Sequence, residues 1–445
     1  MFLFSKLWRI ILVIVCWGLG ILGVWWCVFD GGVLVEVGLG GIKDWLSGLM
    51  VVVVFGVGVV VFLVGWVVSV GRGFGKEVLF ILFISLLASG LSVVSVSVVG
   101  FYILFEMSVV PLLFLIWRFG KTYDRFKAAK MIVGWTVFWG LVFWSVISSV
   151  WWGVSEFCLL NIYGMGLCLV SGSWGLIGYG LVFSLFFVKL SVFGYHLWLP
   201  EAHVEAPSSA SVLLGGVLLK LGAYGVIRFS LGVDFSGISG YQTVLWGFLG
   251  LLVFGVFVIS YVTLFVFNWK KWVAFISVFH MSLGLCLWVL NYGVGYEGFV
   301  IQLVVHSFSC SSAFSLCEVV RLSSGSYGPE SLSGQAGLVK GGQLSLLGVL
   351  FFGCGLIPFL GFFVEVLQGV CGVGFSLLFL VGVHFSFLVV LYSGIRWYQG
   401  GGWGGSFFRV KGGVVWGWLS IWVCFFIGLL FTVYWDLVVL FSYCG

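Results

Sequence analysis

Several ionisable side chains stand inside long apolar runs of the sequence, where they could exchange protons. A charge held at the centre of a bilayer costs about 2.5–3.5 kcal/mol on insertion scales, so such a residue needs a partner, water or a task. The candidates for proton-transfer chemistry are Glu106, Lys189, Lys220, His280, His306 and Glu365.

Lys189 is the first candidate for loading a proton. Desolvation favours the neutral form of a lysine, and a nearby carboxylate favours the charged form. A membrane lysine whose carboxylate partner approaches and withdraws can therefore take up and release a proton. Glu106 is the predicted partner, because it is the mid-span acid of the first half of the chain. A static buried ion pair is the alternative, but it would explain neither Lys220 nor the histidines.

Two histidines could relay protons between Lys220 and Glu365. His280 lies in FISVFHMSLG and His306 in the more polar VVHSFSCSSAFS. Imidazole titrates near neutral pH, which suits a relay between lysines and carboxylates. His384 has no polar neighbours in the sequence and is interpreted as a packed core residue. Separately, Glu318 precedes Arg321 by three residues, a spacing that predicts an ion pair on a helix.

The segment around Lys189 predicts an interrupted helix. Lys189, His196 and His203 are seven residues apart, so one continuous helix would place them on one face. Gly194 and Pro200 oppose continuity, since proline removes a backbone donor and disfavours helix at the residue before it. Broken helices at membrane depth occur where the backbone lines a cavity or a water path.

The second half of the sequence has the same pattern, with Pro358 shortly before Glu365. Interrupted helices at corresponding positions of two halves are typical of the inverted repeats of transporters. The sequence therefore predicts four parts: N-terminal transmembrane helices (1–77), a first antiporter-like repeat (78–231), a second antiporter-like repeat (243–398), and a C-terminal loop and helix (399–445).

The elements that position these residues must be membrane helices. Only 8% of the 445 residues are charged and 62% are hydrophobic, with a mean hydropathy of +1.25. This composition excludes a soluble enzyme and a nucleic-acid-binding protein. A crossing needs about 20 apolar residues, which predicts an all-α polytopic bundle of about 13–14 helices. The predicted crossings are 7–29, 46–70, 78–97, 98–119, 131–154, 174–199, 211–231, 243–267, 272–290, 299–320, 344–364, 372–398 and 415–443.

The distribution of basic residues supports this topology. With the N-terminus inside, the outer loops contain one basic residue, Lys43, and Lys189, Lys220 and Arg228 lie within crossings. The other 16 of the 20 basic residues fall in inner loops or at inner helix ends. Lysine and arginine concentrate on the non-translocated side of a membrane protein, so the charges agree with the predicted spans.

The eleven cysteines are scattered through the chain and form no CxxC motif. The nearest pair, Cys310 and Cys317, is seven residues apart. Iron–sulfur and zinc sites need thiolates at short spacing, so a redox centre in this chain is not expected.

Four segments resemble mitochondrial NADH dehydrogenase subunit 4, an antiporter-like membrane subunit of respiratory complex I. They are FYILFEMSVVPLLFLIWRFG (101–120), HLWLPEAHVEAP (196–207), LLKLGAYGVIRF (218–229) and AFISVFHMS (274–282). The resemblance assigns the family's proton-path residues to Glu106, Lys189, Lys220 and Glu365, and its histidines to His280 and His306. It implies proton pumping driven by distant quinone reduction in the mitochondrial inner membrane.

The resemblance also implies what surrounds the chain. No cofactor is expected in this subunit, whereas FMN, iron–sulfur clusters and ubiquinone are expected in other subunits of the complex. Antiporter-like subunits 2 and 5 and membrane lipids are the expected neighbours, with no nucleic acid.

The sequence departs from the family at three points. Glu201 stands where the family usually has lysine, and Asn268 where it usually has aspartate. The family usually has fourteen helices, so thirteen predicted crossings suggest that the first helix is missing. Two other functions compete with complex I: a subunit of a stand-alone cation/proton antiporter of the same superfamily, and a membrane scaffold whose charges only fix helix register.

Overall fold

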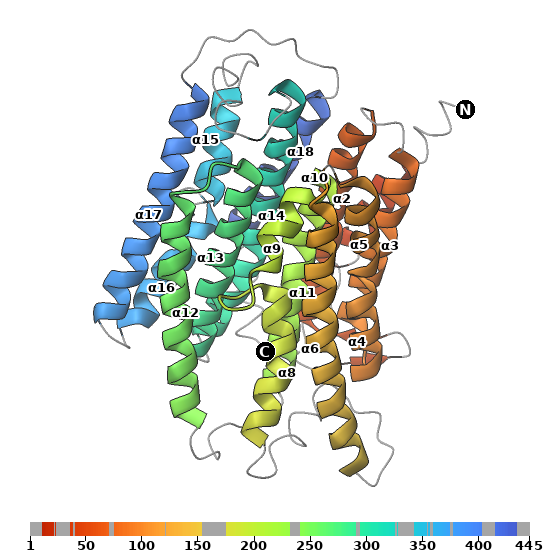
Figure 1. Cartoon of the computed structure of the whole chain (residues 1–445), viewed down its shortest axis with the longest axis vertical. Helices are drawn as coiled ribbons and strands as arrows, with labels where there is room; N and C mark the ends of the chain where they lie inside the picture. The colour runs from red at the N-terminus through yellow and green to blue at the C-terminus, as the bar shows by residue number, and fades with distance from the viewer. Residues whose placement is uncertain are drawn as a thin grey trace.

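The structure is a computed structural model, and it describes most of the 445 residues. The described residues are 11–21, 23, 36–38, 41–70, 75–120, 122–153, 175–231, 241–290, 294–324, 327, 342–353, 355–356, 359–373, 377–402 and 414–433. They form an elongated bundle whose helices run roughly along one axis, as Figure 1 shows. Pro358, predicted to interrupt a helix, lies outside the described residues.

The fold is all-α, as predicted, apart from one short antiparallel hairpin of β1 (Glu36–Gly38) and β2 (Gly41–Lys43). An N-terminal helix covers Ile11–Ile21. The other helices are α2 (Trp45–Val70), α3 (Gly75–Val94), α4 (Val98–Met107), α5 (Val110–Phe119), α6 (Arg125–Gly153), α8 (Gly175–Leu190), α9 (Trp198–Glu205), α10 (Ser208–Leu213), η1 (Leu214–Leu218), α11 (Leu219–Leu231), α12 (Tyr241–Thr263), α13 (Trp269–Leu290), α14 (Val294–Ser324), α15 (Gly342–Gly353), α16 (Leu360–Val373), α17 (Leu377–Gly402) and α18 (Val414–Val433).

The described part of the chain contains 9 helices long and apolar enough to cross a membrane, together with shorter apolar helices. Each of the thirteen predicted crossings overlaps one of them. The protein is therefore a multi-pass membrane protein. One boundary was wrong: the eleventh crossing, predicted to end at residue 364, continues as α16 to Val373.

Three of the predicted crossings are interrupted within the residues that the structure describes. The chain leaves α8 at Leu190 through Ser191 (φ 57°) and Gly194 (φ 92°) and resumes as α9. Lys189 and His203 consequently lie on different helices. Pro200 lies inside the first turn of α9, so the interruption falls before it, around Ser191 and Gly194. The second interruption separates α15 from α16, with Gly355 at φ 67°.

The third interruption was not predicted. The crossing 98–119 consists of α4 and α5, which meet at Ser108 and Val109. Pro111 lies in the first turn of α5, directly after its first residue. Because proline has no backbone N–H, it cannot bond the carbonyl four residues earlier, and the helix breaks there. Glu106 therefore sits at the end of a half-helix and not in the middle of a continuous one.

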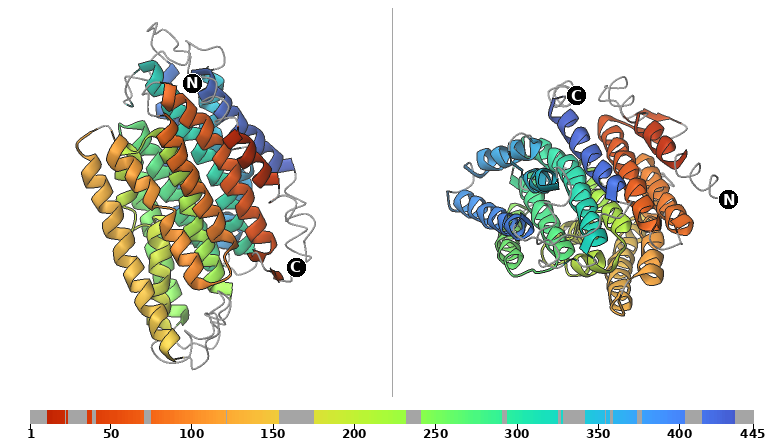
Figure 2. Two further views of the ribbon diagram at one scale, coloured as in Figure 1. Left: turned by 90° about the vertical axis from the view of Figure 1, so that its right-hand side faces the viewer. Right: turned by 90° about the horizontal axis from the view of Figure 1, so that it is seen from above.

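Two wholly buried spans of the bundle carry ionisable residues, among them Lys220 and His306. The α10–α11 span and α14 are buried along their length, whereas α6 and α12 turn most of their residues outward. In the view from above, α14 lies among the other helices, near the middle of the bundle (Figure 2). Its buried serines bond carbonyls three or four residues earlier in the same helix, as Ser307 does with Leu303 and Ser311 with Ser307. Such bonds satisfy hydroxyl groups in an apolar core.

Candidate proton-transfer site

Lys220 is held by an irregular turn of its own helix. It follows η1, a π-helical segment over Leu214–Leu218. Its Nζ donates to the carbonyl of Gly215 at 2.6 Å, and the side chain is fully buried. The wider π turn makes a carbonyl five residues back available to the lysine. Such bulges occur frequently at functional sites.

Lys220 also contacts His306, one of the two histidines predicted to relay protons. Its Nζ lies 2.6 Å from Nδ1 of His306 on α14. An ammonium can only donate, so when Lys220 is charged this ring nitrogen must be the acceptor. A proton can pass directly between the two atoms. The second histidine, His280 on α13, follows at a ring-centroid distance of 5.7 Å.

His280 is oriented by the broken end of α15. Its Nε2 lies 2.9 Å from the carbonyl oxygen of Gly353, the last residue of that helix. A carbonyl only accepts, so Nε2 carries the hydrogen. Among the described residues no partner is found for Nδ1 of His280. That nitrogen remains available for proton exchange.

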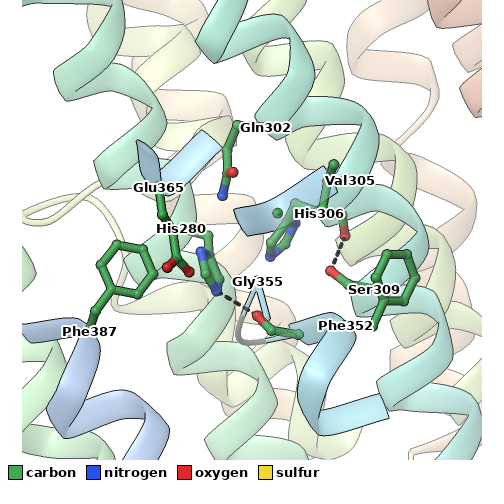
Figure 3. A pocket seen from close by; sticks show the side chains of 11 residues that line it. His280, Gln302, Val305, His306, Ser309, Phe352, Gly355, Glu365 and Phe387 are labelled. Carbon is green, nitrogen blue, oxygen red and sulfur yellow. Dashed lines mark hydrogen bonds between the residues drawn. The ribbon is translucent and has the colours of Figure 1, made fainter. Parts of the chain in front are cut away.

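Glu365 completes the second-half series. It lines the same small cavity as His280 and His306, with a volume of about 10 Å³. Figure 3 shows its carboxyl group directed toward the His280 ring. Oε1 of Glu365 has no hydrogen-bond partner within the described part of the chain. A side chain at Gly355 would collide with this oxygen and with the backbone of Gly361.

The first-half residues form a direct ion pair. Nζ of Lys189 lies 3.2 Å from Oε2 of Glu106, as the sequence predicted, and 4.6 Å from the centre of the Phe105 ring. Lys189 is 3% exposed and Glu106 24%. The other Glu106 oxygen, Oε1, has no partner among the residues described. The pair thus joins the ends of two half-helices, α4 and α8.

The two groups of residues lie on neighbouring helices. Gly222, two residues after Lys220, packs against α8 at Lys189: a Cβ at Gly222 would lie 3.0 Å from the Lys189 Cβ. The absence of a side chain there lets α11 approach the end of α8 closely. The structure therefore places Glu106, Lys189, Lys220, His306, His280 and Glu365 in one region that crosses the bundle interior.

Other residues named from the sequence lie elsewhere. His384 is exposed on α17, and its ring bonds Leu380 of the same helix, so the interpretation as a core residue was wrong. Glu318 pairs with Arg321 as predicted; it is 2% exposed and also accepts a hydrogen bond of 2.5 Å from Ser208. His203 is fully buried and stacked on Phe314.

The two departures from the family pattern have local roles. Glu201 pairs with Lys271 at 3.4 Å on the surface. Oδ1 of Asn268 accepts hydrogen bonds from the backbone N–H groups of Lys270 and Lys271, so it caps the N-terminus of α13. An asparagine caps a helix about as well as an aspartate, and the substitution removes charge without removing the cap.

A second buried ion pair was missed by the sequence reasoning. Arg228, near the end of α11, binds Asp44 at the start of α2, with Nη2 2.6 Å from Oδ1. Oδ1 of Asp44 also accepts from the backbone N–H of Ser47 at 2.8 Å. Although burial raises the pKa of Asp44, its hydrogen bond and charge interaction with Arg228 outweigh burial and lower the pKa below its ordinary value.

The structure also adds uncharged polar groups to the candidate site. These are the Gly215 and Gly353 carbonyls and the amide of Gln302, which lines the cavity beside His306. The double glycine of LLGGVLLK and the glycines of FFGCGLIPFLG are the signals that could have indicated them. No group of three His, Cys, Asp or Glu side chains that could hold a metal ion occurs in the described ranges. The arrangement offers proton transfer between neighbouring bases.

Comparison with known proteins defines the class. Residues 95–391 match the family model described as NADH:quinone oxidoreductase/Mrp antiporter, TM. The chain belongs to this family of membrane subunits.

Among curated proteins, the chain is similar to NADH-ubiquinone oxidoreductase chain 4 of Locusta migratoria, with 34% identity over 57% of this chain and 53% of the relative. The protein of the same name from Mytilus edulis is 33% identical over 62% of this chain and 61% of the relative. The matched region spans about half to three-fifths of these relatives. The predicted resemblance to subunit 4 is confirmed.

Solved structures share the fold over nearly the whole chain. A chain of respiratory complex I from Thermus thermophilus aligns with a TM-score of 0.81 and 20% identity, covering 98% of this chain and 95% of the other. A chain of the Mrp complex from Dietzia aligns with a TM-score of 0.84 and 14% identity, covering 99% and 92%. The antiporter-like architecture predicted from the sequence is confirmed.

Proposed function

We propose that this chain translocates protons as a membrane-arm subunit of a respiratory NADH:ubiquinone oxidoreductase in the mitochondrial inner membrane. The observation that carries the proposal is the buried series Lys220, His306, His280 and Glu365, in which basic and acidic groups from four helices line one path. The names of the relatives support the assignment to that complex.

The first transfer follows from the contact between Lys220 and His306. The charged lysine gives a proton from Nζ to the unprotonated Nδ1 of His306, which leaves a neutral amine and an imidazolium. The imidazolium then releases the proton on its other nitrogen, toward His280 and Glu365. At 5.7 Å between ring centres, this second step requires a bridging water or a ring rotation.

Glu106 controls when a lysine is charged. Close to Lys189, its carboxylate favours the ammonium; withdrawn, it leaves the lysine in a low-dielectric site that favours release. Gly222, two residues after Lys220, keeps α11 packed against α8 at Lys189. The chemistry needs no cofactor in this chain. FMN, iron–sulfur clusters and ubiquinone belong to other subunits in this proposal, with antiporter-like subunits 2 and 5 as neighbours.

The interrupted crossings also support the division of the chain into two repeats. The interrupted α8–α9 crossing belongs to the first proposed repeat (78–231) and the interrupted α15–α16 crossing to the second (243–398). Each half thus contributes a broken crossing beside an ionisable residue, Lys189 in one and Glu365 in the other. Such pairs of interrupted helices support the proposal of two repeats.

Replacing Lys220 by methionine tests the proposal. Methionine keeps the length of the side chain but cannot carry a proton. In the assembled complex, NADH-driven proton translocation should fall by about a hundredfold, the low end of what a positioned proton-transfer group contributes. Lys271→Met is the matched control, because Lys271 is 38% exposed and pairs only at the surface with Glu201. Normal pumping by an assembled Lys220→Met complex would refute the proposed path.

A stand-alone cation/proton antiporter remains the rival, since the Mrp chain has an equally similar fold. Purification of the native assembly distinguishes the two. Flavin- and iron–sulfur-containing subunits that co-purify with this chain support the respiratory complex; an assembly without them supports the antiporter.

A further inference from the structure

Two contacts join the broken crossing α4–α5 to the broken crossing α8–α9. The first is the ion pair of Lys189 and Glu106. In the second, Oγ1 of Thr122, just after α5, donates to Oε1 of Glu205, the last residue of α9, at 2.8 Å. Thr122 follows Glu106 by 16 residues. Glu205 follows Lys189 by the same number, so both contacts join positions 83 residues apart.

The carboxylate of Glu205 is committed to this second contact. Glu205 is 6% exposed, and no basic side chain pairs with it among the described residues. A buried carboxylate needs hydrogen-bond donors. Thr122 supplies two, because its backbone N–H also donates to Oε2, at 3.3 Å. The loop after α5 is thereby fixed to the end of α9.

At its other end, α9 holds the end of α8. Trp198, the first residue of α9, is 3% exposed and donates from Nε1 to the carbonyl of Val188 at 3.0 Å. Val188 directly precedes Lys189. The last carbonyls of a helix have no partner within that helix, so the indole fixes the turn of α8 that carries the lysine.

The backbone at the end of α8 is strained. Ser191 has φ 57°, and it is the one non-glycine residue with a positive φ in the described part of the chain. Its N–H bonds the carbonyl of Val188 at 3.1 Å, and the N–H of Val192 bonds that of Phe187 at 3.2 Å. This pattern is a Schellman helix end, where glycine is usual because the left-handed conformation costs other residues energy. Strain of this kind persists only where the surroundings hold it, and Trp198 bonds the same Val188 carbonyl.

We propose that segments 106–122 and 189–205 form a closed frame that sets the position of Lys189 relative to Glu106. The frame rests on the proposed function, which gives this ion pair its part in proton transfer. Its positioning residues, which act through the pair, are Thr122, Glu205 and Trp198.

The frame explains how the pair can open and close in register. While Thr122 stays bound to Glu205, α5 and α9 cannot slide past one another. Movement is then confined to the breaks between α4 and α5 and between α8 and α9. A lysine that leaves its carboxylate therefore returns to the same place, whereas without the second contact the two crossings can shift and the pair re-forms less often.

Thr122→Val and Thr122→Ser test the second contact. Valine keeps the shape of threonine without the hydroxyl, and serine keeps the hydroxyl. Thr122 is exposed, so neither change disturbs the core. In the assembled complex, NADH-driven proton translocation should fall severalfold in Thr122→Val and stay near normal in Thr122→Ser. An equal loss in both variants, or a loss in neither, would overturn the frame.

Trp198→Phe tests the contact with α8, because phenylalanine keeps an aromatic ring but has no donor. In the intact complex, the backbone amides of residues 188–192 should exchange with deuterium severalfold faster, and pumping should fall severalfold. Trp272→Phe is the matched control, since Trp272 is also 3% exposed and its Nε1 also donates one hydrogen bond of 3.0 Å, to Ser393. It should change neither measurement.

The double variant distinguishes positioning from a general loss of stability. Trp198 and Thr122 act in series through α9, so once one contact is lost the other transmits nothing. Trp198→Phe combined with Thr122→Val should therefore pump as the weaker single variant does. Losses that multiply would mean two independent defects and would overturn the frame. Faster exchange with normal pumping in assembled Trp198→Phe would overturn it too.

The exchange measurement also separates the frame from the proposed function. Normal pumping by Lys220→Met refutes the proton path, but it does not affect exchange at the end of α8. Faster exchange in Trp198→Phe and not in Trp272→Phe supports the frame in either case. Unchanged exchange in Trp198→Phe overturns the frame, whatever Lys220→Met shows.

Discussion

Two of the buried cation–carboxylate pairs in the described part of the chain differ in how firmly they are held. Arg228 contacts both carboxylate oxygens of Asp44, and Asp44 is fixed further as the cap of α2 through Ser47. Lys189 and Glu106 make one contact of 3.2 Å between the ends of two half-helices. The first pair therefore fixes two helices to one another, whereas the second pair can separate by breaking a single contact.

The chemistry of the cations reinforces this difference. Arginine stays protonated in proteins and matches a carboxylate with a planar fork, whereas a buried lysine can lose its proton. A buried cation in the membrane can therefore either hold two helices together or carry a proton. Which of the two it does depends on the residue type and on the hydrogen bonds around it. The static-pair interpretation fits Arg228 and Asp44 better than Lys189 and Glu106.

Lys189→Arg should have the largest effect, because it tests whether the Lys189–Glu106 pair differs from the Arg228–Asp44 pair in exchanging a proton. Arginine keeps the positive charge beside Glu106 but does not release its proton at physiological pH. We expect assembly to be retained and NADH-driven pumping to be lost, because the pair becomes a fixed one. Proton uptake by vesicles containing the assembled complex measures this. Pumping at the normal rate would show that Lys189 needs only its charge.

Asp44→Asn tests the fixed pair. Asparagine preserves the helix cap but removes the carboxylate charge that faces the buried Arg228, and breaking a buried pair costs about 3–5 kcal/mol. Thermal denaturation of the detergent-solubilised complex should show the loss, while the assembled fraction pumps normally. A pumping defect without a loss of stability would assign the pair a place in proton transfer.

The same pair predicts a pH dependence. The pKa of Asp44 lies below its ordinary value of 3.8 in the folded protein. The stability from the pair is therefore present above that value and declines as the pH falls through the lower folded-state pKa. Asp44→Asn should abolish this part of the acid dependence. An unchanged acid melting profile in the variant would contradict the assignment.

Arg228→Lys should have the smallest effect. Lysine restores a positive charge but not the fork that binds both carboxylate oxygens. We expect a loss of about 1 kcal/mol, the size of one net hydrogen bond, measured as a lower melting temperature. A loss as large as that of Asp44→Asn would mean that geometry, and not charge, carries the pair.

Much of the fold was accessible from the sequence because membrane crossings are long apolar runs with a charge bias between their loops. The predicted partnership of Glu106 with Lys189 was correct because few acids lie at that depth. The break between α4 and α5 could also have been predicted, since Pro111 stands in the middle of the predicted crossing 98–119. It was missed because apolar composition alone defined the span.

Other features depend on tertiary packing that no local pattern reports. Asp44 and Arg228 are separated by 184 residues and meet only in the folded bundle. The carbonyl of Gly353 becomes an acceptor for His280 only because the folded bundle brings the end of α15 next to α13. His384 looked like a core residue because hydrophobic neighbours in sequence do not reveal which face of α17 is covered.

The π turn before Lys220 has a consequence for how this family can change. Such a turn accommodates one more residue than the regular helix around it would, so deleting Gly215 or Gly216 would let α10 and α11 merge into an uninterrupted helix. One residue corresponds to about 100° of helical rotation, which the wide turn absorbs locally. The helices on either side would therefore keep their facing after the deletion, but the turn that offers a carbonyl to the Nζ of Lys220 would be lost.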